Sequence, residues 1–84
     1  MSPDTFFFVR LIVDKDVYSY GPYLDLESAT IILMDVMPAI AKIKAKKNWY
    51  SYECLLVESI LHEQTEWQEV NTHLIQNKCY KKRN

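Results

Sequence analysis

Four residues in the C-terminal part of the chain are of the types that bind metal ions and would share one face of a helix. His62, Glu66, Glu69 and His73 follow one another at intervals of four, three and four, which would place them on one face of a helix. Imidazole and carboxylate groups arranged in this way can bind zinc or a similar divalent ion. A solvated polar helix face explains the pattern more simply, because structural zinc sites close with four well-placed ligands at a local spacing that is missing here. We therefore expect no bound metal and no cofactor.

Other kinds of catalytic chemistry have less support in the sequence. Gly21 is the only glycine, whereas a Walker or dinucleotide-binding loop needs several glycines to let main-chain amides approach a phosphate. Cys54 and Cys79 have no identifiable base nearby and no metal-ligand spacing. The paired acids Asp14 and Asp16 are explained by a polar turn. We expect that the protein is not an enzyme, and a small metal-dependent enzyme is the catalytic alternative.

Two short segments repeat an alternating tyrosine pattern. They are Val17-Tyr18-Ser19-Tyr20-Gly21 and Trp49-Tyr50-Ser51-Tyr52-Glu53. Successive side chains of a β-strand point to opposite faces, so each segment would place two tyrosines on one side of a sheet. Tyrosine packs against apolar surface while offering a hydroxyl group, and it is enriched at protein interfaces. We predict a partner-binding surface that consists of Tyr18, Tyr20, Tyr23, Trp49, Tyr50 and Tyr52.

Length and charge narrow the classes of partner. The chain has 84 residues, 49% of them hydrophobic, and a net charge of -1, so we expect a single domain over residues 1–84 with no general attraction to nucleic acid or anionic membranes. Basic residues form two short clusters, at 42–47 and at 78–83. There is no apolar run of the ~20 residues that a membrane span needs, and the start of the chain lacks a signal-peptide pattern. We expect a cytoplasmic protein with reduced thiols.

The N-terminal half predicts a hairpin followed by a helix. In residues 6–13 the odd-numbered positions would form one wholly apolar face of a strand, and a polar turn separates them from a second strand over 17–20. Gly21-Pro22 should end that second strand. A helix over 26–46 should follow, capped by Asp25 or Ser28, with a kink or a break near Met37 because of Pro38.

The C-terminal half is harder to assign. Residues 49–59 predict a third strand, although the leucines and glutamates of this stretch also fit a helix. A final helix over 63–76 would present Trp67, Val70 and Leu74 on one stripe. Residues 1–4 and 78–84 should be frayed. The expected fold class is α+β, with a three-stranded, mostly antiparallel sheet in the order hairpin, helix, strand, helix. The first helix should cover the Phe7, Val9 and Leu11 face.

These observations favour a non-enzymatic protein–protein interaction module. We expect it to bind and to regulate or inhibit a larger protein, in the manner of the small inhibitors that phages and mobile elements encode. A short chain with so much apolar sequence should also form a homodimer at micromolar concentration. The alternative from another class is a single-stranded nucleic-acid binder that stacks bases on the tyrosine face.

Overall fold

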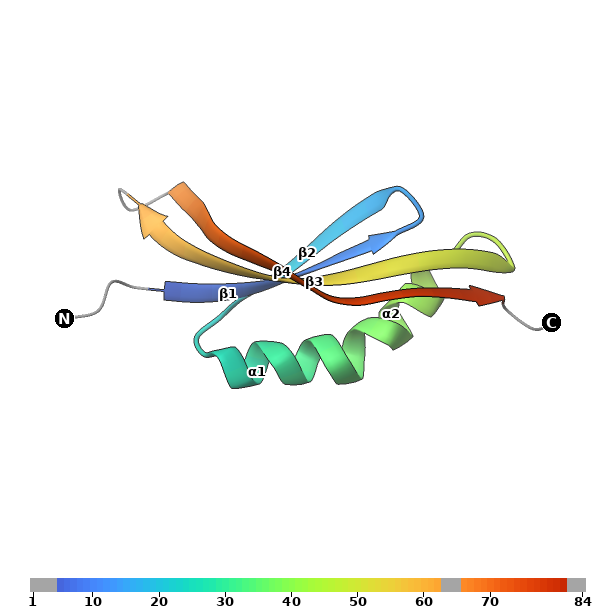
Figure 1. Ribbon diagram of the computed structural model, residues 1–84, viewed down its shortest axis with the longest axis horizontal. Helices are drawn as coiled ribbons and strands as arrows, with labels where there is room; N and C mark the ends of the chain where they lie inside the picture. The colour runs from blue at the N-terminus through green and yellow to red at the C-terminus, as the bar shows by residue number, and fades with distance from the viewer. Residues whose placement is uncertain (1–4, 63–65, 82–84) are drawn as a thin grey trace.

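The protein is a four-stranded antiparallel sheet with one helical segment packed against one of its faces (Figure 1). The computed structural model describes residues 5–62 and 66–81. The elements are β1 (Thr5–Val13), β2 (Asp16–Tyr23), α1 (Leu26–Ile31), the π-helical turn η1 (Ile32–Val36), α2 (Met37–Lys44), β3 (Trp49–His62) and β4 (Glu66–Lys81). The strand order is β2-β1-β3-β4, so the N-terminal and C-terminal hairpins meet along β1 and β3.

The predicted N-terminal hairpin is confirmed, but its second strand is longer than expected. Asp14 turns the chain at φ 56°, a conformation that aspartate tolerates, and its main-chain amide donates to the Ser51 carbonyl oxygen at 2.9 Å. β2 continues through Gly21-Pro22 to Tyr23 instead of ending at Tyr20. Proline is tolerated there because β2 lies at an edge of the sheet, where an amide hydrogen is not needed on the outer side.

The helix begins and bends where the sequence predicts. Asp25 is the N-cap: its carboxylate accepts a hydrogen bond of 2.7 Å from the Ser28 amide, and this bond lowers the pKa of Asp25. Pro38 lies in the first turn of α2 and has no amide hydrogen for the helical ladder. The chain widens into η1 just before it, and the Met37 amide bonds the Ile32 carbonyl oxygen.

The π turn keeps one apolar stripe of the helix on the sheet. Ala29, Leu33, Met37 and Ala41 are each at most 1% exposed although they are spaced by four residues throughout. A regular α-helix has 3.6 residues per turn, so this spacing would drift around the axis. The wider turn of η1 contains more residues than an α-helical turn, so it compensates for this drift and the stripe continues to face the core.

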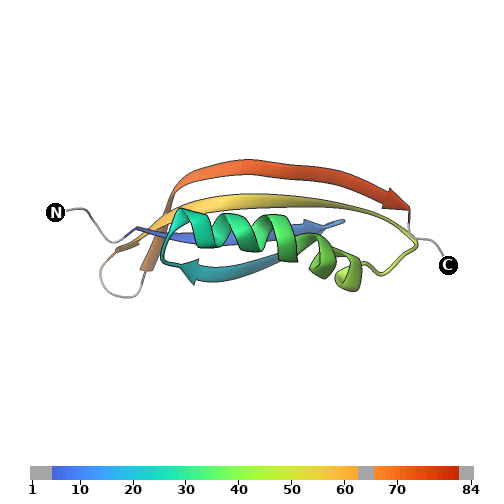
Figure 2. The same cartoon turned by 90° about the horizontal axis from the view of Figure 1, so that it is seen from below.

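The core lies between this stripe and one face of the sheet. The helix covers the Phe7, Val9 and Leu11 face of β1, as expected. The buried sheet residues of the core are Val9, Leu11, Val13, Tyr50, Tyr52, Cys54 and Leu56. Figure 2 shows the helix lying along β1 between β2 and β3, with β4 beyond its reach.

The predicted final helix is wrong. Residues 66–81 form β4, the longest strand, which pairs with β3 along its whole length, so the sheet has four strands rather than three. Residues 63–65 of the expected helix lie outside the described residues. The ambiguous stretch after Trp49 is a strand, as predicted, and continues past Ser59 to His62. β4 itself runs on to Lys81, into the predicted frayed tail, whereas 1–4 and 82–84 lie outside the described residues.

Because β4 is a strand, the molecule has a covered face and an open face. No described helix packs on the side of the sheet opposite α1 and α2 (Figure 1). The molecule measures 52 × 22 × 17 Å, and the long β3–β4 hairpin accounts for its elongated shape. None of the helices in the described part of the chain is long and apolar enough to cross a membrane.

Candidate partner-binding face

The open face has a patch of aromatic and polar side chains near the end of β3. Strand alternation places the even-numbered side chains of β1 there, because the odd-numbered ones point into the core. Pairing then brings side chains of β3 and β4 to the same side. We call the following residues the open-face pocket: Phe8, Arg10, Ser19, Val57, Ser59, Trp67 and Glu69.

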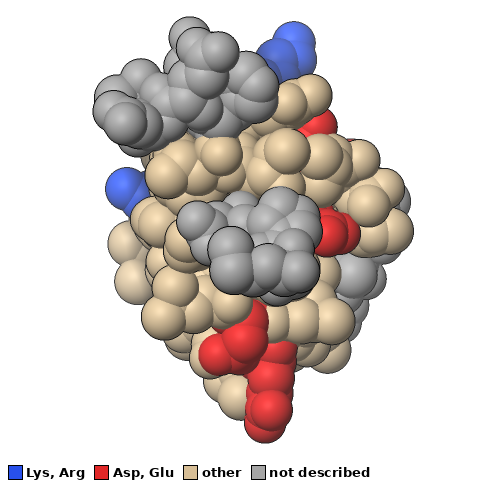
Figure 3. Space-filling model, turned by 90° about the vertical axis from the view of Figure 1, so that its left-hand side faces the viewer, with Lys and Arg blue, Asp and Glu red and all other residues tan. Residues whose placement is uncertain are grey.

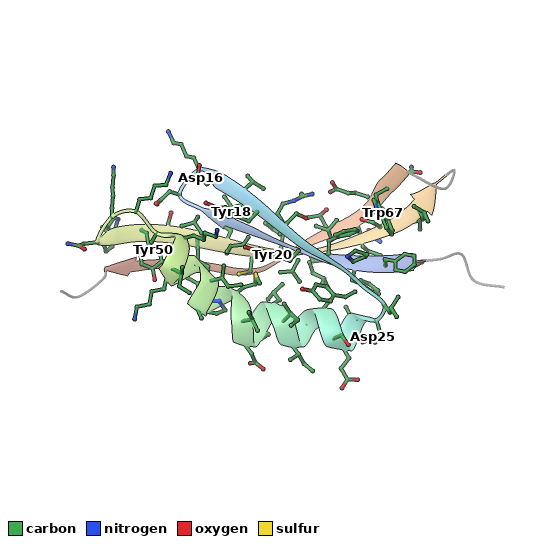
Figure 4. All side chains as sticks on the ribbon, turned by 180° about the vertical axis from the view of Figure 1, so that it is seen from behind. Asp16, Tyr18, Tyr20, Asp25, Tyr50 and Trp67 are labelled. Atoms are coloured by element: carbon green, nitrogen blue, oxygen red, sulfur yellow. The ribbon has the colours of Figure 1, made fainter. Side chains whose placement is uncertain are left out.

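Trp67 is held in the open-face pocket by two phenylalanines of β1. Its ring centroid lies 5.1 Å from those of Phe6 and Phe8, with interplanar angles of 86° and 81°. Such edge-to-face contacts stabilise a pair by about 0.5–1.5 kcal/mol beyond the area that it buries. Trp67 is nevertheless 42% exposed, so a large part of a fixed indole remains available on the surface. Figure 4 shows Trp67 on the side of the sheet away from the helix.

A β-bulge in β4 determines that the Glu69 side chain lies on the open face. Glu58 pairs with Asn71 but the next residue, Ser59, pairs with Glu69, so Val70 is an extra residue in β4. Bulges of this kind re-aim the side chains beside them. Glu69 therefore stands opposite Ser59 on the open face.

The charges of the pocket neutralise each other. A terminal nitrogen (Nη2) of Arg10 donates to the Glu69 carboxylate (Oε2) at 2.8 Å, and both side chains are partly exposed. An exposed pair like this contributes little to stability, about 0–1 kcal/mol. It does fix the guanidinium on one wall, and Arg10 is the only Lys or Arg among the described residues that line the pocket.

The floor and the size of the pocket limit what it can hold. Val57 and Ser59 form the floor and are each only 1% exposed. The hollow measures about 160 Å³, which is below the ~300–1,000 Å³ of clefts that bind drug-sized molecules. A single apolar side chain of a partner matches this volume better than a cofactor does.

The structure divides the predicted tyrosine surface. Tyr50 and Tyr52 are 4% and 1% exposed, stack on each other at 6.4 Å, and face the helix, so they belong to the core. Tyr18, Tyr20 and Tyr23 are half-buried and pack against the same core from β2. Figure 4 shows Tyr20 and Tyr50 lying between the sheet and the helical segment.

Trp49 is the exposed member of the predicted surface. It is 60% exposed and starts β3. Trp49 and Val57 are eight residues apart along an extended strand, which corresponds to roughly 25 Å. Trp49 therefore does not line the open-face pocket. Lys44 lies over the Tyr18 ring, 4.9 Å from its centroid, and covers part of the β2 tyrosines.

The four residues of the predicted metal site do not share a helix face. The predicted helical row from His62 to His73 does not form, because Glu66, Glu69 and His73 belong to a strand. Within 5–62 and 66–81, no group of three or more His, Cys, Asp or Glu residues is placed to hold a metal ion. Cys54 is fully buried, and burial raises the pKa of its thiol to about 11, which makes it a poor nucleophile.

Trp67 and Glu69 are the pocket residues that sequence reasoning assigned to the wrong element, a helix instead of β4. Figure 3 shows acidic side chains at the lower end of this view, and Asp25 and Glu27, at the start of α1, are both exposed. Comparison with protein-family models, with curated proteins and with solved structures found no match for this chain. A proposal for the function therefore has to start from the chemistry of the open face.

Proposed function

We propose that this protein is a non-enzymatic interaction module that binds a larger protein through the open-face pocket and thereby regulates or inhibits it. The observation that carries the proposal is the placement of Trp67, which is fixed by two phenylalanines yet 42% exposed beside a hollow. Tryptophan and arginine are the residues that most often dominate binding energy at protein interfaces. A rigid indole also loses little conformational entropy when a partner covers it.

The chemistry of the pocket favours a protein over a nucleic acid. Bases stack on exposed aromatic faces, and backbone phosphates need unpaired cations. Here the three aromatic rings meet edge to face, and Arg10 is already paired with Glu69. The partner that fits is a loop or strand that inserts one apolar side chain over Val57, while its polar groups meet the Arg10–Glu69 pair.

The test compares two tryptophans that are similarly exposed. Tagged wild-type protein is used to isolate a partner from host cells, and the affinity of the purified partner is then measured for wild type, Trp67→Ala and Trp49→Ala. We expect Trp67→Ala to weaken binding at least ~30-fold, the equivalent of about 2 kcal/mol for a central aromatic anchor. Trp49→Ala should change the affinity by less than about threefold, because isolated exposed contacts contribute little.

Folding and the nucleic-acid alternative are checked in the same series. Circular dichroism and a urea titration of both variants establish that the sheet remains intact. Equal affinities of Trp67→Ala and wild type would refute the pocket as the binding site. Salt-dependent retention of a single-stranded oligonucleotide that disappears in Trp67→Ala would instead support the nucleic-acid binder.

A further inference from the structure

The outer edge of β4 is the longest unpaired strand edge in the described part of the molecule. β4 has sixteen residues, and its only neighbour in the sheet is β3. An edge of this kind presents a row of main-chain donors and acceptors that can pair with another strand. The opposite edge, β2, has only eight residues, and it contains Gly21 and Pro22, which make pairing with another strand less favourable.

The charges along β4 are separated by sign. Glu66 and Glu69 lie in the first half of the strand, whereas Lys78 and Lys81 lie in the second half. If two copies of β4 pair side by side and antiparallel, the acidic half of each strand meets the basic half of the other. A parallel arrangement would set like charges side by side, which is destabilising. The sequence of β4 is thus complementary to itself in the antiparallel direction.

We infer that β4 pairs with β4 of a second copy of this chain, about a two-fold axis near His73, to form one continuous eight-stranded sheet. Extra residues interrupt the β3–β4 ladder at Val70 and at Ile75, on either side of this point. About this axis, the irregularity at Val70 of one strand would lie close to the irregularity at Ile75 of the other strand. The contact uses an edge and not the open-face pocket, so it stands independently of the proposed function.

The geometry of the edge is sufficient for a stable contact. An antiparallel ladder forms about one hydrogen bond per residue, so pairing of most of β4 offers on the order of ten bonds, the number in a typical protein interface. Pairing β4 with β2 of another molecule would leave two new edges open and continue without closing. The two-fold β4 contact closes on itself, which makes the occupant a single second copy.

The test uses two double variants. Two copies of the same variant should repel each other, whereas one copy of each should attract. Glu66→Lys with Gln68→Lys makes both halves of the edge basic, and Lys78→Glu with Lys81→Glu makes both halves acidic. Glu69 is left unchanged because it binds Arg10. We expect wild type to dimerise at micromolar concentration in sedimentation velocity. Each variant alone should be monomeric, and an equimolar mixture should form a mixed dimer at least ~tenfold tighter than either variant alone.

Matched controls carry the same changes of net charge on the helical segment and on the loop that follows it. Asp35→Lys with Ala39→Lys, and Lys42→Glu with Lys47→Glu, change exposed positions away from β4 and should dimerise like wild type. Recovery of the dimer on mixing excludes misfolding as the cause of the monomers. The inference is overturned if wild type stays monomeric at high micromolar concentration. It is equally overturned if the β4 variants dimerise as wild type does, or if their mixture remains monomeric.

Discussion

Truncation of Tyr52 to alanine should remove a large part of the stability of the fold. The Tyr52 side chain is 1% exposed and stacks on Tyr50 beneath the helix. A buried aromatic side chain removes about 150–250 Å² from water, which corresponds to ~4–6 kcal/mol at ~25 cal/mol per Å². Measured truncations of buried aromatic residues cost about 3–5 kcal/mol, so we expect a loss near 4 kcal/mol. A domain of 84 residues has a total stability of roughly 4–13 kcal/mol.

Urea unfolding followed by circular dichroism measures this loss. With a slope of about 1–1.5 kcal/mol per M for a domain of this size, the midpoint of Tyr52→Ala should fall by roughly 3 M. Tyr52→Phe keeps the ring and should cost only about 1 kcal/mol, the usual contribution of one hydrogen bond. Trp49→Ala, at an exposed site, should change stability by less than about 0.5 kcal/mol. A Tyr52→Ala midpoint within 0.5 M of wild type would refute the placement of this tyrosine in the core.

Two further predictions concern Cys54 and Gly21. In a Cys79→Ser background, the Cys54 thiol should resist iodoacetamide at pH 8 until the protein is unfolded in urea, because it is buried and its pKa is raised to about 11. The unfolded thiol ionises first as the pH rises, from its ordinary pKa of 9.0, so the contribution of Cys54 to stability should be constant below pH 9 and fall between pH 9 and about 11. A thiol that reacts equally fast in native and unfolded protein would contradict this. Gly21→Ala should lower stability by about 1–3 kcal/mol in a urea titration, since Gly21 has φ 132° and an added Cβ would lie 3.0 Å from the Phe7 carbonyl oxygen. An unchanged midpoint would show that β2 relaxes at no cost.

The sequence was sufficient for the N-terminal half because local patterns and tertiary packing agree there. Alternation in β1, the Asp25 cap and the break at Pro38 each have a short-range physical cause, and each appears in the structure. The second strand was predicted too short because Gly21-Pro22 is a strong turn signal. Its edge position, which permits proline inside a strand, is a property of the whole sheet.

The error at β4 has a specific cause. A regular strand repeats every two residues, but the extra residue Val70 interrupts that period between Trp67 and Leu74. Trp67, Val70 and Leu74 consequently fall at spacings of three and four, which is the signature of an amphipathic helix. Only the pairing with β3 distinguishes a bulged strand from a helix here, and the sequence does not display that pairing.

The placement of the β3 tyrosines could have been found in the sequence. Tyr50 and Tyr52 share their alternation with Cys54 and Leu56, so the even-numbered side of β3 is apolar from residue 50 to residue 56. The odd-numbered side contains Ser51, Glu53 and Ser59 among its members. Extending the alternation beyond the tyrosine pair would have assigned Tyr50 and Tyr52 to the core, and would have directed attention to the other face of the sheet.

The two proposed contacts would give the assembled protein two equivalent binding sites. A two-fold axis between antiparallel strands stands perpendicular to the sheet, so both open faces would lie on the same side of a β4-linked dimer. Trp67 lies six residues from His73, and two copies would therefore stand roughly 40 Å apart. Such a dimer would bind a two-fold symmetric partner through both pockets, and its avidity could exceed the affinity of a single pocket by about 10²–10⁴-fold. Trp67→Ala should then weaken capture without affecting the dimer, whereas the β4 charge variants should retain single-pocket affinity and lose only the avidity.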